Sequence, residues 1–401
     1  MRVGPEPLHL TYCTNIHAGE TWDEIRTNLD RYVLAVKKLV APDQSFGVGL
    51  RLSGQAAEVL SRPEELDRFR DWLGEHDLYV FTINGFPYGR FHGTPVKEQV
   101  YLPDWLDETR LTYTDRLALI LSELLPTEPG LEGSVSTSPG AFKPRVRGPA
   151  DVTAMATMML RHAATLHRIR ESTGKTISLA IEPEPCCHME TVAETVTFFR
   201  DHLFGADAIG TFERLTGLGR VASEEAIRRH ITVCFDACHM AVEFEDPAAG
   251  LAALRGAGIA IGKFQISAGI RVASLTPELL ERLRPFAEGV YLHQVVERRG
   301  GRFTRYVDLP EALADAERSG TADREWRIHF HVPLFLEQLG AFVNTQAYLR
   351  ELLAMLRAGS PSRHLEVETY TWDVLPEEYR REDIVSAVAR ELNWVRDRLV
   401  S

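Results

Sequence analysis

Short apolar runs rich in β-branched residues alternate along this chain with longer segments whose apolar residues recur every three or four positions. The first pattern is typical of buried strands and the second of amphipathic helices. The clearest helical spacing occurs in 21–40, 63–76 and 151–174. Strands are predicted at 8–15, 46–53, 78–85, 133–139, 177–184, 231–237, 259–267 and 364–371.

This alternation predicts an α/β protein with a parallel sheet, and eight strands suit closure into a (β/α)8 TIM barrel. The structural alternative is an open doubly wound sheet, which usually carries a glycine-rich turn after its first strand. No such turn follows residues 8–15, so the barrel is favoured. Thr21 and Glu24 have the spacing of a capping box at the start of the first helix, and Gly174 is placed to end the third.

Two segments interrupt the alternation. Residues 86–115 follow the third strand, are rich in aromatic residues, glycine and proline, and are predicted to form a loop over the barrel mouth. Residues 290–335 are predicted to be an insertion between strands seven and eight, with a β-hairpin around Gly300 and Gly301. No linker or repeat divides the chain, so residues 1–401 are interpreted as one domain.

The composition of the chain disfavours several classes of partner and location. The net charge of −12 disfavours nucleic acid and anionic membranes as partners, although a few local cations can still hold a small phosphorylated substrate. The five cysteines are odd in number and irregularly spaced, which favours reduced thiols in the cytoplasm. No apolar run approaches the ~18 residues of a membrane span, and we expect no signal peptide.

Acidic, amide and basic side chains interrupt the last four strands, near the ends where barrels of this type carry their chemistry. Period-two alternation places Glu182 and Glu184 on one strand face, and Glu366 and Glu368 on another. The residues that stand out are Glu182, Glu184, Asp236, His239, Lys263, Gln265, Glu366 and Glu368.

Several carboxylates that converge in an apolar barrel repel one another and are costly to bury, and a divalent cation relieves both problems. We therefore predict a metal site formed by Glu182, Asp236, Gln265 and Glu368. Its oxygen-rich donor set favours Mn²⁺ or Mg²⁺, with Zn²⁺ or Co²⁺ as alternatives. Glu182 and Glu368 are the catalytic candidates.

Other residues have both a functional and a structural interpretation. Gln265 is either a ligand or a hydrogen-bonded core amide, and the cysteines are interpreted as small buried hydrophobic residues. His329 and His331 share one strand face and either reach the mouth or are ordinary polar strand residues. Asn15 and Arg51 are weaker candidates for contacts at the mouth. The candidates for substrate binding are His239, Glu184, His17, Asn84, His331 and Lys263.

At these positions the sequence resembles the xylose-isomerase-like barrels of the sugar phosphate isomerase/epimerase superfamily. In that family a glutamate ends strand five, an aspartate followed three residues later by a histidine ends strand six, and a glutamate ends strand eight. Glu182, Asp236 with His239, and Glu368 match these positions in order. The family's strand-seven ligand is commonly histidine, whereas Gln265 is the candidate here.

A closer resemblance, to the EboE-type metabolite traffic proteins of the same superfamily, covers nearly the whole chain. It implies a role in making or moving a small metabolite built on a sugar or cyclitol. In the wider family of xylose-isomerase-like barrels, epimerisation uses the glutamates that correspond to Glu182 and Glu368, on opposite faces of the substrate. The segments that carry this resemblance are 10–22, 96–114, 180–191, 234–247, 329–335 and 365–376.

Three functions follow as hypotheses. The first is a metal-dependent isomerase or epimerase that acts on a small sugar, sugar phosphate or cyclitol. The second is a non-catalytic binder or carrier of a small metabolite, suggested by Gln265. The third is a metal phosphodiesterase similar to the barrel endonucleases, which the acidic charge disfavours. A homodimer is compatible with each.

Overall fold

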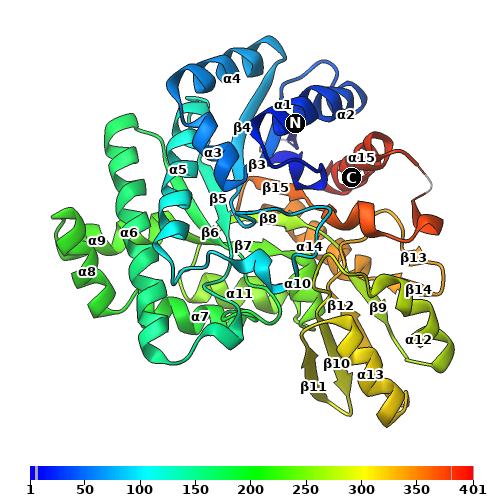
Figure 1. The fold of residues 1–401 in the computed structure, drawn as a ribbon. Helices are drawn as coiled ribbons and strands as arrows, with labels where there is room; N and C mark the ends of the chain where they lie inside the picture. Colours follow the sequence, from blue (N-terminus) through cyan, green and yellow to red (C-terminus); the bar gives the residue numbers. More distant parts are fainter. Residues whose placement is uncertain (5–7, 381, 401) are drawn as a thin grey trace.

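The computed structural model describes residues 1–4, 8–380 and 382–400. Its centre is a barrel of eight parallel strands, which confirms the (β/α)8 prediction (Figure 1). A short strand, β1 (Arg2–Val3), adds to β2 in the antiparallel direction. In barrel order the parallel strands are β2 (Leu8–Tyr12), β15 (His364–Val367), β8 (Ile261–Ile266), β7 (Ile231–Asp236), β6 (Ile177–Ile181), β5 (Gly133–Thr137), β4 (Leu78–Asn84) and β3 (Phe46–Arg51).

The seam between β2 and β3 closes the barrel with few backbone contacts. The Thr11 hydroxyl donates to the Gly47 carbonyl at 2.6 Å and accepts from the Gly49 amide at 3.0 Å. A Cβ on Gly49 would lie 2.1 Å from Glu366 Oε1 and 2.5 Å from the Tyr12 carbonyl oxygen. The seam therefore requires glycine at position 49.

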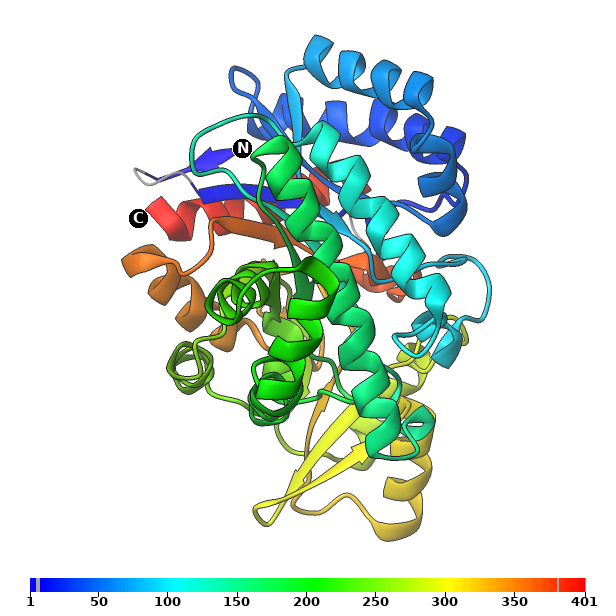
Figure 2. The ribbon, with the colours of Figure 1, turned by 90° about the vertical axis from the view of Figure 1, so that its left-hand side faces the viewer.

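The helices cover the outside of the barrel (Figures 1 and 2). The capping box at Thr21 and Glu24 is present, and Gly174 ends the third predicted helix with φ 73°. The pattern over 21–40 did not reveal the π-helical segment Leu29–Val33 that separates α1 from α2. The helices are α1 (Trp22–Asn28), α2 (Leu34–Val40), α3 (Gly54–Leu60), α4 (Pro63–Glu75), α5 (Glu108–Leu124), α6 (Pro149–Thr173), α7 (Val192–Phe198), α8 (Ala206–Thr216), α9 (Arg220–His230), α10 (Ala237–Val242), α11 (Pro247–Gly256), α12 (Pro277–Leu283), α13 (Leu309–Ser319), α14 (Gln346–Gly359) and α15 (Ile384–Val400).

The segment after β4 is shorter than predicted. It contains a 3-10 turn at Lys97–Tyr101, and α5 already begins at Glu108, where the Asp107 side chain caps the helix. The aromatic and proline-rich part of 86–115 is therefore loop, but its last residues are the first two turns of a buried helix. Further 3-10 or π turns lie at Thr14–Ile16, Lys143–Arg145, Phe199–Leu203, Arg284–Phe286, Tyr370–Val374 and Glu377–Tyr379.

The insertion between β8 and β15 forms a second sheet beside the barrel, at the bottom of Figure 2. The predicted hairpin is present, with Gly300 at φ 54° and Gly301 at φ 79° in its turn. The sheet extends beyond 290–335 on both sides. The sequence did not reveal the additional strands, because strands of two or three residues are too short to show an alternating pattern. Its strands, in order, are β11 (Arg302–Tyr306), β10 (Val295–Arg299), β12 (Glu325–Ile328), β9 (Ile270–Val272), β14 (Phe342–Asn344) and β13 (Gln338–Leu339).

Glu391 on α15 joins the insertion to the end of β15. Its Oε1 accepts from the Leu334 amide at 3.1 Å and from the Thr369 hydroxyl at 2.8 Å. Burial raises the pKa of this carboxyl to about 7. The folded state holds this proton more tightly than the unfolded chain. The contribution of the protonated Glu391 carboxyl to the free energy of unfolding is therefore complete below about pH 4.5 and is lost as the pH rises through about 7.

We predict that Glu391→Gln, which keeps the accepting oxygen and is neutral at every pH, stabilises the protein at pH 8 by on the order of 1–2 kcal/mol. At pH 5 the difference from wild type is expected to fall below about 1 kcal/mol. Urea unfolding at the two pH values measures it, and a difference that does not change with pH contradicts the assignment.

Gly49→Ala is expected to lower the free energy of unfolding by about 1–3 kcal/mol or more, because the new methyl group overlaps Glu366 and the β2 backbone. Gly74→Ala is the matched control, since no atom lies within 4 Å of a Cβ at this position in the last turn of α4. The control should be neutral or stabilising by up to about 1 kcal/mol. Equal thermal stability of the two variants would refute the steric argument.

Candidate metal centre

Three carboxylates meet where β6, β7 and β15 end. Glu182 directly follows β6, Asp236 is the last residue of β7, and Glu368 directly follows β15. One oxygen from each lies within 4.8 Å of the other two, although these residues are distant in the sequence. All three are buried, with at most 5% of each residue exposed.

Some polar atoms in and around these carboxylates lack a hydrogen-bond partner among the described residues. Asp236 Oδ1 accepts from the His239 amide and the Ser267 hydroxyl, both at 2.8 Å, but its buried Oδ2 accepts no hydrogen bond. Gln265, which neighbours Asp236 across the β7–β8 ladder, has both side-chain amide atoms buried without a partner. Each unpaired atom costs about 1–3 kcal/mol, and Asp236 Oδ2 and Gln265 Oε1 have lone pairs that a cation would accept, so these oxygens fit a metal ion.

Two amides fix the orientation of Glu368. Asn15 donates from Nδ2 to Glu368 Oε1 at 2.7 Å, and Asn84 donates to the same oxygen at 3.0 Å. The other oxygen, Oε2, lies 3.7 Å from His331 Nδ1. Asn15 comes from the 3-10 turn after β2, Asn84 is the last residue of β4 and Gln265 lies on β8, so six strands contribute to the centre.

Burial and mutual repulsion raise the pKa values of these carboxyl groups in the absence of a cation. Burial, with repulsion from Asp236 and Glu366, raises the pKa of Glu368 to about 8. Burial and the charge of Glu368 raise the pKa of Glu182 well above its usual range, and burial raises that of Asp236. A bound divalent cation would reverse these shifts by favouring the ionised forms.

Three histidines lie beside the carboxylates. His239 follows Asp236 in α10, and His329 and His331 follow β12 of the insertion. His239 Nε2 is 3.1 Å from His329 Nε2, which is 3.2 Å from His331 Nε2. Burial lowers the pKa of His239 to about 3 and that of His331 to about 4, so both rings are neutral at physiological pH.

Glu184 lies beside two of these histidines, with its Oε1 3.6 Å from His329 Nδ1. Its Oε1 accepts from the Tyr101 hydroxyl at 2.8 Å and from Gln294 Nε2 at 3.2 Å, while its Oε2 is buried without a partner. Burial raises the pKa of Glu184 to about 8, although both hydrogen bonds oppose the shift. This carboxyl is thus a further group able to hold a proton near neutral pH.

These groups open into a cavity with about 520 Å³ of empty space, mouth included. Aromatic rings from the loop after β4, the insertion and the turn after β15 form much of its wall. The lining residues are Asn15, Asn84, Phe86, Pro87, Phe91, Lys97, Val100, Tyr101, Glu182, Glu184, His239, Tyr291, Leu292, Gln294, His329, Glu368 and Tyr370.

Most residues predicted for the site lie at or beside the cavity. Glu182, Glu184, Asn84, His239 and Glu368 line it. The others near it lie behind this surface: Asp236, Gln265 and His331 are at most 1% exposed, and Asp236 and His331 take part in the groups placed to bind metal.

Two predicted substrate contacts lie elsewhere. His17 stacks on Tyr32 with ring centroids 4.1 Å apart and bonds to the Tyr12 hydroxyl at 3.0 Å, away from the cavity. Lys263 is fully buried in an ion pair with Glu366. It precedes Gln265 by two residues on β8 and therefore lies deeper in the barrel, where a substrate has no access.

The sequence interpretation left the role of His329 open and did not select Tyr101, Gln294 or Tyr370, which also line the cavity. For His329 a signal was present, because the His-Phe-His alternation places both histidines on one face and Phe330 in the core. The other three lie in loops, where no periodicity indicates direction.

No protein-family model matches the sequence, and no curated protein matches it. Among solved structures, the chain is similar to a xylose isomerase-like TIM barrel protein from Mycobacterium smegmatis in complex with magnesium, with 12% identity and a TM-score of 0.52 over 98% of this chain and 96% of that one. A xylose isomerase domain protein from Planctomyces limnophilus matches with 11% identity and a TM-score of 0.48 over 92% and 93% of the two chains. The IOLI protein with a zinc atom matches with 12% identity and a TM-score of 0.44 over 98% of each chain.

The likeness to the first of these proteins shows that this chain has the xylose isomerase-like TIM-barrel fold. Within the described residues, no helix combines the length and the apolar character needed to cross a membrane. The carboxylate and histidine groups are placed to hold a metal ion.

We predict that Mn²⁺ raises the melting temperature by several degrees, in line with about 2.7 kcal/mol at a hundredfold excess over Kd. The shift should be larger at pH 8 than at pH 6, because at the lower pH the ion must displace protons from carboxyl groups such as Glu368, whose pKa is about 8. Thermal unfolding with and without Mn²⁺ measures this. An equal shift in Asp236→Asn, or a larger shift at pH 6, contradicts the site.

Proposed function

We propose that this protein is a metal-dependent isomerase or epimerase that acts on a small sugar or cyclitol. The observation that supports it most is the convergence of Glu182, Asp236 and Glu368 at one side of a cavity. Their oxygen donors, with Gln265, favour Mn²⁺ or Mg²⁺. When bound, the cation would polarise a carbonyl or hydroxyl group of the substrate and so acidify a neighbouring C–H or O–H bond.

The chain's own residues would move the proton. Glu182 and Glu368 come from strands that are separated by β7 and β8, so they approach the centre from different directions. This suits removal of a proton from one face of a substrate carbon and its return on the other. Asn15 and Asn84 hold Glu368 in place, and the rings of Phe86, Phe91 and the neighbouring tyrosines would exclude water.

The lining favours an uncharged substrate over a phosphorylated one. Among the described residues that line the cavity, Lys97 carries the only ammonium or guanidinium group. Its Nζ already donates to the carbonyl groups of Glu288 at 2.9 Å and Tyr291 at 2.7 Å, and to Asp308 at 2.6 Å. All three of its protons are therefore engaged, and a phosphate would have to displace one of these partners.

The resemblance to EboE-type proteins supports a role in the biosynthesis or traffic of a metabolite, in the cytoplasm. A carrier function on the same barrel is the second candidate. Gln265 favours it, because an amide at this position cannot accept a substrate proton as a basic side chain would.

Purified protein loaded with Mn²⁺ is expected to exchange solvent deuterium into a carbon-bound position of at least one member of a panel of sugars, sugar phosphates and cyclitols, detected by mass spectrometry. Glu182→Gln and Glu368→Gln should each reduce the exchange at least about a hundredfold, because they remove the proton acceptor. Glu171→Gln, on the exposed surface of α6, is the matched control and should retain it.

The carrier function predicts a different result. It is supported if no member of the panel exchanges deuterium while a panel member still binds and raises the melting temperature. The isomerase proposal fails if exchange persists unchanged in both glutamine variants.

A further inference from the structure

The β-hairpin of the insertion is strongly basic, although the net charge of the chain is −12. Residues 298–305, RRGGRFTR, contain four arginines and no acidic residue. The hairpin consists of β10 and β11 and projects from the molecule at the bottom of Figure 2. Every residue of β11 is exposed except Tyr306, which is partly buried. The hairpin therefore presents a cationic surface to solvent.

Two arginines of the hairpin face each other without a counter-ion. Arg305 pairs with Glu243 beside the barrel. Arg299 and Arg302 are instead Cα partners in the β10–β11 ladder, so their side chains leave the same face of the hairpin. Neither forms an ion pair or a side-chain hydrogen bond with any residue that the structure describes. Like charges directly opposite in a sheet are destabilising, so an anionic group beside them would relieve the repulsion.

The other face of the hairpin is also short of acidic groups, because three guanidinium groups share the Glu325 carboxylate of β12. Arg271 donates to it at 2.8 Å, Arg298 pairs with it, and Arg327 lies 3.8 Å from it. Arg271 and Arg327 are also Cα partners in the ladder between β9 and β12. The sheet around the hairpin therefore has a surplus of positive charge on both faces.

The strand β11 is at one edge of the six-stranded sheet, where it pairs with β10. Beyond this ladder, no backbone hydrogen bond joins residues 302–305 to another part of the described chain. Alternate peptide groups of the strand therefore point to solvent. Such an edge can accept a further strand, whereas its arginines discourage pairing with the same basic strand of a second copy.

The side chains of β11 determine which residues a further strand would carry. Alternation places Arg302 and Thr304 on one face of the strand and Phe303 on the other. Phe303 is 48% exposed, and its ring centroid lies 5.3 Å from that of Phe244. Cross-strand neighbours interact best when their chemistry is complementary, so acidic side chains fit beside Arg302 and apolar side chains fit beside Phe303.

We propose that β11 binds an extended segment of a partner protein in which acidic and apolar residues alternate. Backbone hydrogen bonds along the edge would hold the segment, and its acidic side chains would lie beside Arg299 and Arg302. Nucleic acid fits this surface less well, because phosphate groups make no use of a strand edge and the rest of the chain is acidic. An anionic membrane fits less well too, since a single phenylalanine, Phe303, offers little apolar surface to insert.

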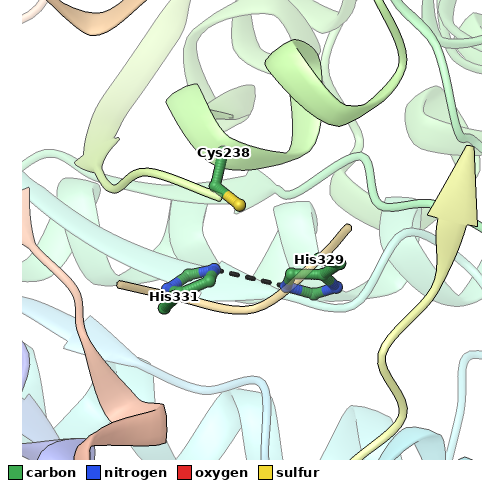
Figure 3. Close-up of side chains that lie close together, drawn as sticks. All are labelled: Cys238, His329 and His331. Atoms are coloured by element: carbon green, nitrogen blue, oxygen red, sulfur yellow. Dashed lines mark hydrogen bonds between the residues drawn. The ribbon is translucent and has the colours of Figure 1, made fainter. Parts of the chain in front are cut away.

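The proposed edge belongs to the same sheet that supplies two histidines beside the cavity. The strand β10 pairs with both β11 and β12, and β12 leads directly to His329 and His331 (Figure 3). None of the described residues of β11 lines the cavity. The partner would therefore bind without occupying the place of the substrate.

The test uses the full-length protein and a short fluorescein-labelled peptide of alternating glutamate and valine. Fluorescence anisotropy should show saturable binding that weakens as the salt concentration rises. A peptide of alternating lysine and valine should not bind. A glutamate and valine peptide that is N-methylated at every residue keeps its charge but lacks the backbone donors, and it should not bind either. Amide hydrogen exchange, followed by mass spectrometry, should slow in residues 302–306 when the unmethylated acidic peptide is bound.

Arg299→Gln/Arg302→Gln should weaken binding of the acidic peptide about five- to thirtyfold, because it removes two exposed ion pairs. Phe303→Ser should also weaken it, since the apolar side chains of the peptide lose their contact. Arg214→Gln/Arg220→Gln is the matched control, which removes the same charge from exposed positions on α8 and α9, away from the insertion (Figure 1). The control should bind the peptide as wild type does.

The proposal is overturned if the acidic peptide does not bind at low salt, if the N-methylated peptide binds equally well, or if exchange in residues 302–306 does not slow. An equal loss of binding in the control variant would also overturn it, because net charge would then explain the binding. Binding of duplex DNA or of phosphatidylserine vesicles, without binding of the acidic peptide, would assign the hairpin to that partner instead. None of these measurements involves turnover, so their outcome is independent of the isomerase proposal.

Discussion

The barrel places carboxyl groups of like charge close together at the buried base of its cavity. Glu182, Asp236 and Glu368 come from three strands and approach within 4.8 Å, and burial opposes the ionisation of each. The surrounding structure maintains the arrangement at a cost: Asn15 and Asn84 fix one carboxylate, Ser267 and a helix amide fix another, and several polar atoms stay unpaired. A fold that retains such a cluster gains stability only when something positively charged joins it.

Much of this arrangement could be predicted from the sequence, because a barrel places the carboxyl ends of its strands at one rim. Polar residues in otherwise apolar strands therefore predicted Glu182, Asp236 and Glu368 as a group. For Lys263 the sequence did not show how deep in the barrel its side chain lies. Alternation indicates which face of a strand a residue occupies, but not its distance from the rim, and Lys263 lies one layer of side chains below the cavity. His17 lies in a turn, where alternation gives no direction.

The insertion shows a second reason why part of the structure could not be predicted from the sequence. Its strands β9, β13 and β14 have two or three residues each, too few for a period to appear. Their positions depend on pairing in series, β9 with β12, β14 with β9 and β13 with β14, which only the folded chain defines. The same pairing directs His329 and His331 toward the barrel, so the histidine group forms only when the insertion packs against α10. The hairpin was predictable because two adjacent glycines mark its turn locally.

The buried pair of Lys263 and Glu366 has a consequence for the charge of the whole centre. Glu366 is directly below the cluster, and its partner ammonium cancels its charge, so three carboxylates contribute to the balance above. With one divalent ion in the carboxylate site, that balance would be a single negative charge, since neutral imidazoles add nothing. Such a centre would repel a deprotonated oxygen and favour a neutral hydroxyl group. Net charge at the base of the barrel would thus exclude anions for the same reason that the engaged lysine at its rim does.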